Sequence, residues 1–384
     1  MAQSGEINPV PAPPLNAPAS SNTCELWAID ATTDILVPTV SLIEPEIKGH
    51  EFLNLPTFAF YIHNPRLNKR VLFDNGARKD WWNVPPRVFH NLKTKGVAGI
   101  RTTYDVYDIL AAGGVDPKTI DAVVWSHFHW DHVGNIQLFP KSTDIVVGPG
   151  FKKAFLPGYP ADPKSPFYEA DFEGRNLREI KFDDSLKIGK FQAYDYFGDG
   201  SFYILNTPGH TIGHISGLVR TTPDTFVFLG GDISHFPGTY RPTQYVPLPE
   251  VLPAETKLDA RFSLPCACSL FTACHPNPST ARTTPYYHVS QHQDSWYDDP
   301  QQAQKSIDGL MEFDASENVF VAIAHDPALR EVCELFPHAT LNEWKAKGWA
   351  RRSHWHFVNE LPIDGKPGRP KLVEGLLKDG KPVE

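Results

Sequence analysis

The sequence predicts an α+β fold in which two mixed β-sheets are stacked face to face, with helices on the outer faces. Two observations support this prediction. Apolar segments of strand length alternate with helical segments, and no internal repeat indicates a solenoid or a propeller. Several of the strands also end in histidine or aspartate, at positions from His127 to His325. Because such side chains form a site only when they meet, we expect all of these strands to belong to one domain.

The first strand end carries the most informative motif of the chain. Residues 120–126 are apolar and rich in β-branched side chains, which predicts a buried strand, and residues 104–112 before them are expected to form a helix. The strand is followed by His-Phe-His-Trp-Asp-His at residues 127–132. Imidazole and carboxylate ligands suit zinc and related divalent ions. No cysteine lies within residues 127–132, so the motif does not indicate a closed structural site. One short stretch cannot surround a single ion with four ligands, so we expect two adjacent ions.

Three further apolar strands end in the same kinds of side chain. The loop at the end of a buried strand is a frequent position for site residues. The strand ends are His210, on a Gly-Pro turn after residues 202–205, then Asp232 after residues 225–229, and His325 after residues 319–323.

In this order the residues resemble the signature of the metallo-β-lactamase-fold hydrolases, which is His-x-His-x-Asp-His followed by a lone His, a bridging Asp and a final His. All seven positions are filled. The resemblance extends from about Leu55 to about His325 and includes Asp74-Asn75-Gly76, similar to an early Asp-x-Gly of the family. It implies the αβ/βα sandwich of that family. It also implies a ligand set in which His127, His129 and His210 bind one metal, Asp131, His132 and His325 bind the other, and Asp232 bridges the two.

Within that superfamily, the complete ligand set and the turn at residues 209–214 look most like the acyl-homoserine-lactonase branch and related fungal lactam hydrolases. The lactonases carry a tyrosine three residues after the bridging aspartate, where it contacts the substrate carbonyl. This chain has His235 at that position. His235 is therefore a candidate for the same contact, or for protonating a leaving nitrogen, since imidazole is the side chain that most often serves as a general acid. The alternative is a turn residue that bonds only to the backbone. His214 is expected to support a ligand from behind.

The resemblance implies a dinuclear metal-dependent hydrolase that opens a small lactam or lactone by attack of a metal-bridging hydroxide. Two cations lower the pKa of a shared water to roughly 7 and polarise the carbonyl. Asp131 and Asp232 are candidates to orient that hydroxide and carry its proton. We expect two Zn²⁺ ions, although the ligands would also accept manganese, cobalt or iron. Degradation of a xenobiotic or a signal molecule is the corresponding role.

Aromatic side chains close to these strand ends are the candidates for substrate binding. Trp81 and Trp82 follow the Asp-x-Gly segment, and Phe236 and Tyr240 follow Asp232 together with His235. Such walls suit a flat or apolar small molecule, although aromatic residues are more often part of the core.

The amino-acid composition argues against nucleic-acid and membrane partners. The formal net charge is −9 without any long basic run, so a nucleic-acid backbone would be repelled. No apolar stretch reaches the length of a membrane span or of a signal peptide, and the five cysteines suit a reducing compartment, so we expect a soluble, cytoplasmic protein. A homodimer is compatible with the sequence. We expect a flexible proline-rich tail at residues 1–24, one catalytic domain at 25–360 and a C-terminal tail at 361–384.

Two other functions share parts of these motifs. A thioester hydrolase of the glyoxalase II kind has the same metal signature, but it would need a basic cluster for the glutathione carboxylates. An inactive metal-binding scaffold is the non-enzymatic alternative, yet inactive members normally lose ligands. A separate structural zinc site is conceivable at Cys266, Cys268, Cys274 and His275, although their spacing favours ordinary buried cysteines.

Overall fold

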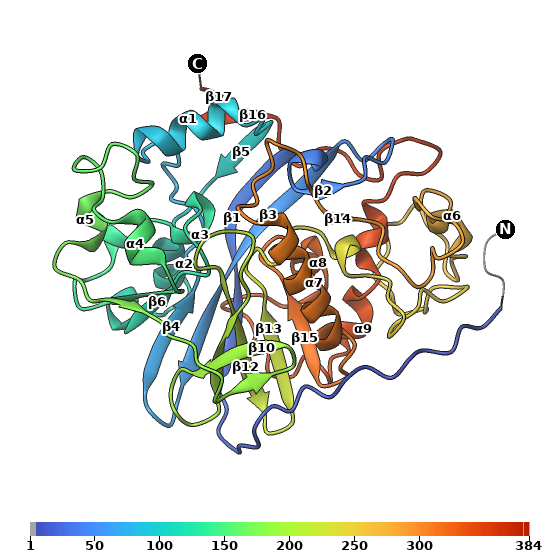
Figure 1. Cartoon of the computed structure of the whole chain (residues 1–384), viewed down its shortest axis with the longest axis horizontal. Coiled ribbons are helices and arrows are strands. Elements are labelled where there is room, and N and C mark those ends of the chain that lie inside the picture. The colour runs from blue at the N-terminus through green and yellow to red at the C-terminus, as the bar shows by residue number, and fades with distance from the viewer. Residues whose placement is uncertain (1–4, 379, 384) are drawn as a thin grey trace.

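The computed structural model describes residues 5–378 and 380–383. Two stacked β-sheets form its centre and helices cover their outer sides, which confirms the predicted fold class (Figure 1). In the described residues the larger sheet has nine strands, in the order β17 (Lys381–Pro382), β16 (Gly375–Lys378), β5 (Gly99–Thr102), β1 (Glu25–Pro38), β3 (Phe52–Asn64), β4 (Lys69–Phe73), β6 (Ala122–Val124), β7 (Asp144–Val147) and β8 (Leu177–Glu179). Pairing is antiparallel around β1 and β3 and parallel from β4 to β8, so the sheet is mixed.

The second sheet lies against the first and is also mixed. In order across it, its strands are β15 (Val319–Ala322), β13 (Thr225–Leu229), β12 (Ile215–Thr222), β11 (Phe202–Asn206), β10 (Phe191–Asp195) and β9 (Lys187–Ile188). Only β13 and β15 run parallel, and the others pair antiparallel with their neighbours. A separate short pair consists of β2 (Ile43–Glu44) and β14 (His288–Val289).

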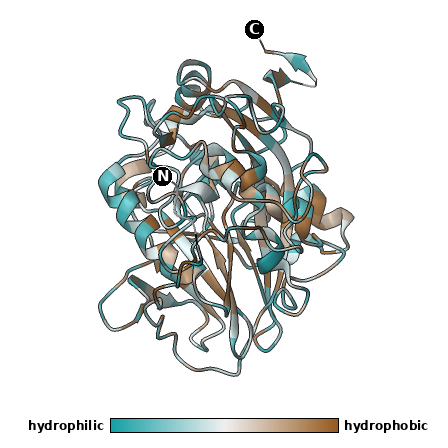
Figure 2. Cartoon of the chain, turned by 90° about the vertical axis from the view of Figure 1, so that its right-hand side faces the viewer, coloured by the Kyte–Doolittle hydropathy of each residue, from teal (hydrophilic) through white to brown (hydrophobic). Residues whose placement is uncertain are grey.

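The layer between the two sheets is the central core. Phe58 and Phe60 of β3 face it from the larger sheet, and Phe202 and Val227 face it from the smaller one, all at most 1% exposed. Figure 2 shows the same pattern, with hydrophobic strands inside and hydrophilic segments at the periphery. Truncating one such phenylalanine to alanine typically costs about 3–5 kcal/mol, so this layer holds the strand ends in fixed positions.

Helices cover the outer faces. α7 (Pro300–Asp314) begins where the Asp299 side chain accepts the Gln302 N–H at 3.0 Å with proline at the first helical position, and it packs Phe313 against Phe228 of the smaller sheet. No helix of the described residues is long and apolar enough to cross a membrane. The other helices are α1 (Pro86–Thr94), α2 (Val106–Ala112), α3 (Trp130–Val133), α4 (Phe151–Phe155), α5 (Glu169–Phe172), α6 (Ser269–Thr272), α8 (Pro327–Val332) and α9 (Trp349–Ser353), with 3₁₀ turns at Thr39–Ser41, Pro117–Thr119, Ile136–Leu138, Pro237–Thr239 and His356–Asn359.

Both terminal segments contact the domain more closely than tails would. The N-terminal segment runs extended along the surface, where Val10 N–H donates to Gln244 O at 2.9 Å and Asn22 Nδ2 donates to Asp199 O at 3.0 Å (Figure 1). At the other end, β16 pairs in parallel with β5 and β17 returns beside β16. The expected boundary at residue 360 therefore does not separate a tail from the sheet. Residues 1–4, 379 and 384 of the two expected tails lie outside the described residues.

Candidate metal centre

The loops that carry the predicted ligands all leave the same edge of the stacked sheets. β6 leads into the His-rich motif, β13 into Asp232 and β15 into His325, while the Ile215 N–H of β12 donates to Ser126 O at 2.9 Å and ties the two sheets together there. The turn before Asp232 requires glycine, because Gly231 has φ +51° and a Cβ on it would lie 2.7 Å from the Ser126 Cβ.

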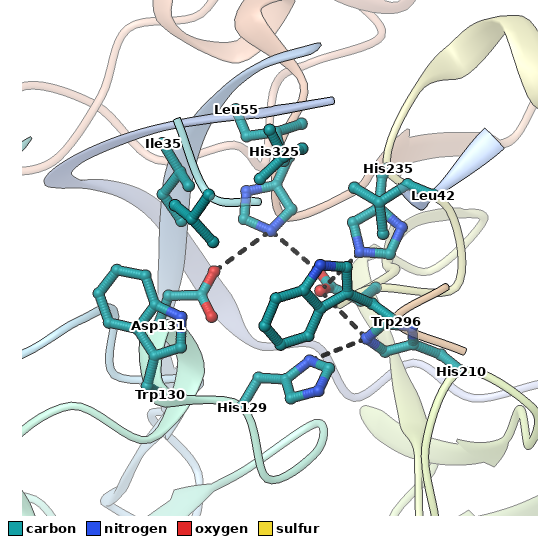
Figure 3. Close-up of a pocket in the computed structure, with 13 residues that line it drawn as sticks. Ile35, Leu42, Leu55, His129, Trp130, Asp131, His210, His235, Trp296 and His325 are labelled. Carbon is teal, nitrogen blue, oxygen red and sulfur yellow. Dashed lines mark hydrogen bonds and ion pairs between the residues drawn. The ribbon is translucent and has the colours of Figure 1, made fainter. Parts of the chain in front are cut away.

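The seven predicted ligands form two groups that share this edge. His127, His129, His210 and Asp232 bring ligand atoms within 4.8 Å of one another, and so do Asp131, His132 and His325. Asp232, His235 and His325 form a third grouping of the same kind. The allocation expected from the resemblance therefore corresponds to two spatial clusters, and Figure 3 shows His129, Asp131, His210 and His325 around one pocket.

The first group converges on its nitrogen atoms. His129 Nδ1 lies 2.9 Å from His127 Nε2 and 3.0 Å from His210 Nε2. Asp232 Oδ2 lies 3.5 Å from His127 Nε2 and 3.4 Å from His210 Nε2. Zinc–nitrogen bonds are about 2.0–2.1 Å long, so nitrogen atoms at these separations can bind one ion together.

The second group meets the other oxygen of the same carboxylate. Asp232 Oδ1 lies 3.2 Å from both His132 Nε2 and His325 Nε2. Asp131 Oδ2 lies 3.5 Å from the first of these nitrogens and 3.6 Å from the second. Asp232 thus presents one oxygen to each group, which is the geometry of a bridging ligand.

The donor atoms are suited to a cation. His132 Nε2 and Asp232 Oδ1 are buried and, although they lie 3.2 Å apart, neither makes a hydrogen bond within the described residues, a costly arrangement unless an ion binds them. Burial lowers the pKa of His127 and His210 well below 6.5 and that of His129 to about 4, so these imidazoles keep bare nitrogens. The residues therefore fit a divalent metal.

The charges of the second group also favour a bound cation. Burial alone would lower the pKa of His132, but the carboxylates of Asp232, Asp131 and Asp74 outweigh it and raise that pKa well above 6.5. Burial would also raise the pKa of Asp232, yet the surrounding imidazoles, His132 first, hold it well below 3.8. The group therefore has excess negative charge that a bound cation would balance.

Hydrogen bonds from behind fix several of the ligands. His325 Nδ1 lies 3.0 Å from Pro56 O, which accepts its hydrogen and leaves Nε2 for the site. His214, predicted to support a ligand, accepts the backbone N–H of Asp232 at Nε2 (3.1 Å) and donates from Nδ1 to Thr207 O (2.9 Å). That prediction is confirmed. Such partners set the tautomer and the direction of a ligand.

His235 lies at the edge of the site, as the sequence suggested, and not in an isolated turn. Its Nε2 lies 3.0 Å from Asp232 Oδ2, its side chain is 4% exposed, and its Nδ1 lies 2.9 Å from the hydroxyl of Tyr297. No sequence feature had singled out Tyr297, which comes from the loop between β14 and α7.

The other predicted substrate contacts do not line the metal-side cavity. Trp81 is fully buried and donates from Nε1 to Leu377 O at 2.7 Å, with Trp82 packed against it. Tyr240 is also fully buried, and Phe236 packs against His50. Trp81, Phe236 and Tyr240 belong to the interior, and Trp82 is half-buried under Lys378. Beside the ligands and His235, the cavity is lined by Ile35, Val37, Leu42, Leu55, Val97, Trp130 and Trp296.

Trp296 stands between two cavities. The one beside the ligands has a volume of about 50 Å³, and a second one of about 150 Å³ also contacts His129, Trp130 and Trp296. The indole lies edge-on to His129, with ring centroids 5.7 Å apart, and is drawn between His129, His210 and His325 in Figure 3. The Ser-Trp-Tyr-Asp-Asp-Pro sequence at 295–300 is readable as a helix start, but nothing in it indicates a position at the site.

The cysteine-rich segment does not form a second metal site in the described residues. No metal-ligand group includes Cys266, Cys268 or Cys274. His275 instead accepts the Asn277 N–H at Nδ1 and faces backbone carbonyls with Nε2. The cysteines are free, as favoured from their spacing.

Comparisons with known proteins agree with this geometry. The profile of the metallo-beta-lactamase superfamily matches residues 82–264. γ-Lactamase FDB1 of Fusarium pseudograminearum (strain CS3096) is 40% identical over 377 residues, which cover 94% of this chain and 90% of the relative. γ-Lactamase MBL2 of Gibberella moniliformis (strain M3125 / FGSC 7600) is 43% identical over 245 residues, 63% of this chain and 100% of the relative.

Among solved structures, a mutant of B. thuringiensis AiiA with N-decanoyl-L-homoserine at its active site superposes with a TM-score of 0.53. The two chains are 19% identical, and the match covers 83% of this chain and 99% of the other, which shows a shared fold. Together with the extended identity to the fungal relatives, the fold and the complete ligand set lead to one assignment: the chain belongs to the metallo-β-lactamase superfamily.

Proposed function

We propose that this protein is a metal-dependent hydrolase that opens a small cyclic amide or ester, a lactam or a lactone. The observation that carries the proposal is the complete ligand set, arranged as two groups around Asp232. It occurs in a chain that is 40% and 43% identical to two relatives named γ-lactamases. The two groups support two ions, and the histidine and aspartate ligands favour Zn²⁺.

Bound divalent ions would supply an activated water and a Lewis acid for the scissile carbonyl. The protein supplies the remaining functions. Asp131 and Asp232 present carboxylate oxygens that can accept and pass on a proton within the site. Ile35, Leu42 and Leu55 line the same cavity with apolar side chains, which limit the access of bulk water. His235 lines the same cavity, and a hydrogen on its Nε2, which lies 3.0 Å from Asp232 Oδ2, could be passed to a carbonyl oxygen or to a leaving nitrogen.

The cavity favours a small cyclic substrate over a glutathione thioester. A glutathione conjugate carries two carboxylates, for which the thioester hydrolases need basic residues. No lysine or arginine is among the described residues that line the metal-side cavity, and its walls are mainly aliphatic and indole side chains. Location in the cytoplasm, a homodimer and the lack of a nucleic-acid partner stay predictions from the sequence.

A substrate panel tests the proposal. Purified protein would be treated with a chelator, reloaded with Zn²⁺ and assayed against paired lactams and lactones and against a glutathione thioester, with Asp232→Asn as the inactive control. We expect ring opening that depends on metal and is lost in the control. Turnover of the thioester alone would contradict the proposal, and so would ring opening that persists in the metal-free protein.

A further inference from the structure

Residues 295–299 form a segment at the site, here called the 295–299 strap. In the sequence, the strap lies beyond residues 82–264, which the superfamily profile matches. The strap is bound to the loop of one ligand, because Asp298 N–H donates to His210 O and Asp299 N–H to Gly209 O, both at 2.9 Å. The ring of Tyr297 lies 4.9 Å from that of His210 at an interplanar angle of 80°. Tyr297 is therefore held in place from both sides.

Tyr297 and Asp232 contact opposite nitrogens of the same imidazole. The Tyr297 hydroxyl lies 2.9 Å from His235 Nδ1, and Asp232 Oδ2 lies 3.0 Å from His235 Nε2. All three side chains are at most 7% exposed. Water is thus largely excluded, and the protons of these groups have to be placed among the three residues themselves.

Counting hydrogens leaves one consistent arrangement. An ionised carboxylate only accepts, so the nitrogen that faces Asp232 carries the hydrogen. The Tyr297 hydroxyl has no other hydrogen-bond partner among the described residues, so its hydrogen needs His235 Nδ1 as the acceptor. If Nδ1 also carried a hydrogen, the buried Tyr297 O–H would be left without an acceptor.

This arrangement decides between two roles of His235. Its Nε2 belongs to a group with Asp232 and His325 that is compact enough to bind a metal ion, so an eighth ligand is one reading. A nitrogen that carries a hydrogen cannot bind a metal. We propose that Tyr297 is a positioning residue whose O–H donates to His235 Nδ1 and thereby keeps the hydrogen of His235 on Nε2, where it is directed at Asp232 Oδ2 beside the cavity.

This proposal concerns the same site as the proposed hydrolase function. Its effect on catalysis rests on that function. A hydrogen on His235 Nε2 can be shared between Asp232 and a bound substrate, whereas a bare nitrogen would compete for the ions. The tautomer itself is a property of the folded chain and can be measured without any substrate.

The chain contains a matched control for the central contact. Tyr287 places its hydroxyl 2.6 Å from His50 Nδ1, and both residues are buried. Neither residue belongs to a metal-ligand group. Tyr287→Phe thus removes the same type of bond as Tyr297→Phe without touching the site, so stability effects of losing a buried hydroxyl are matched.

The decisive measurement is a two-bond ¹H–¹⁵N correlation spectrum of protein labelled with ¹⁵N at histidine. Spectra are recorded for the metal-free and the Zn²⁺-loaded protein. The His235 signals are assigned by their loss in His235→Gln. We expect a protonated Nε2 and a bare Nδ1 for wild-type His235 in both forms. In Tyr297→Phe the hydrogen should shift toward Nδ1 or Nε2 should become metal-bound, whereas in Tyr287→Phe the His235 signals should stay unchanged. The wild-type spectra need no variant of Tyr297, so they decide even if Tyr297→Phe folds poorly.

Three results would overturn the proposal: a metal-bound Nε2 in the wild type, hydrogens on both nitrogens, or an unchanged tautomer in folded Tyr297→Phe. Steady-state kinetics provide a second test. Tyr297→Phe should lower kcat by about three- to tenfold, the size of one hydrogen bond, with little change in KM. If no lactam or lactone is turned over at all, the proposed function fails while the spectra still test the tautomer.

Discussion

Asp74 Oδ2 lies 2.8 Å from His132 Nδ1, and the other oxygen of the same carboxylate accepts the backbone N–H of Ser126 at 2.7 Å. Because a carboxylate only accepts, His132 carries its hydrogen on Nδ1 and offers Nε2 to the second ligand group. The residue that the sequence placed at an early strand end therefore acts on a ligand 58 positions later in the chain.

Asp74→Asn should weaken metal binding about 10–100-fold, because the amide no longer orients and polarises His132. Competition with a chromophoric chelator measures the affinity. Asp199→Asn is the control, since Asp199 bonds Arg66 and Asn64 and no metal-ligand group. An affinity that is equal in Asp74→Asn and wild type would show that His132 needs no such support.

Asp232→Ala should abolish hydrolysis and lower the metal content below the proposed two ions per chain, because it removes the oxygens that face both groups. His127→Ala should lower it as well, through the loss of one ligand nitrogen. Elemental analysis after gel filtration gives the stoichiometry. Two ions retained in Asp232→Ala together with intact turnover would refute the bridging assignment.

His235→Ala should depress lactam turnover by roughly a hundredfold or more if His235 protonates the leaving nitrogen, and should affect esters with good leaving groups much less. Steady-state kinetics on a matched lactam and lactone give the ratio. Equal losses on both would instead indicate binding or stabilisation of the oxyanion. Unchanged kinetics on both would leave His235 without a catalytic role.

Trp296→Ala should join the two cavities that its indole separates, and the site should then accept larger ring substituents. We expect kcat/KM to rise for a substituted ring relative to the unsubstituted one. Trp82→Ala is the control, because Trp82 packs on Trp81 and lines neither cavity. A substrate ratio that shifts in Trp82→Ala and not in Trp296→Ala would reverse our assignment of the wall.

Acid stability should depend on Glu331. Burial alone would raise its pKa, but hydrogen bonds from His356 and Arg369 lower it to about 2. Since a free glutamate titrates near pH ~4.3, the folded state gains stability above that pH and loses it as the pH falls toward 2. After allowance for partial exposure, the gain is about 1–3 kcal/mol.

Urea unfolding of metal-free protein between pH 5 and pH 2 measures this gain. The difference in unfolding free energy between wild type and Glu331→Gln should shrink as the pH falls. Glu334→Gln, which removes an exposed partner of Lys347, should show a much smaller dependence. A difference between wild type and Glu331→Gln that stays constant over this range would contradict the assignment.

The ligands were predictable because they are local. Residues 127–132 follow an apolar strand directly, and His210, Asp232 and His325 each follow another strand. Strand pairing brings such ends to one edge, so the order of the motifs along the chain predicts which residues lie together. The two stacked sheets were predictable for the same reason, since strand and helix periodicities are local signals.

The cavity walls were not predictable, because they depend on contacts between distant segments. Trp81 follows a strand end closely, yet the last strands of the chain cover it. Trp296 and Tyr297 lie far from any ligand motif, and only the packing of their loop on the His210 turn brings them to the site. Side-chain type alone did not distinguish the aromatic residues of the core from those of the cavity.

The pairing of β16 with β5 has a consequence for how this protein can be shortened or fused. β5 would be the edge of the larger sheet if the chain ended at residue 360, and its free N–H and C=O groups would be open to strands of other molecules. A truncated protein should therefore aggregate through strand addition while its metal ligands are still complete. Fusion partners are better placed at the N-terminal side, where the described chain before Glu25 runs along the surface and forms no strand of either sheet.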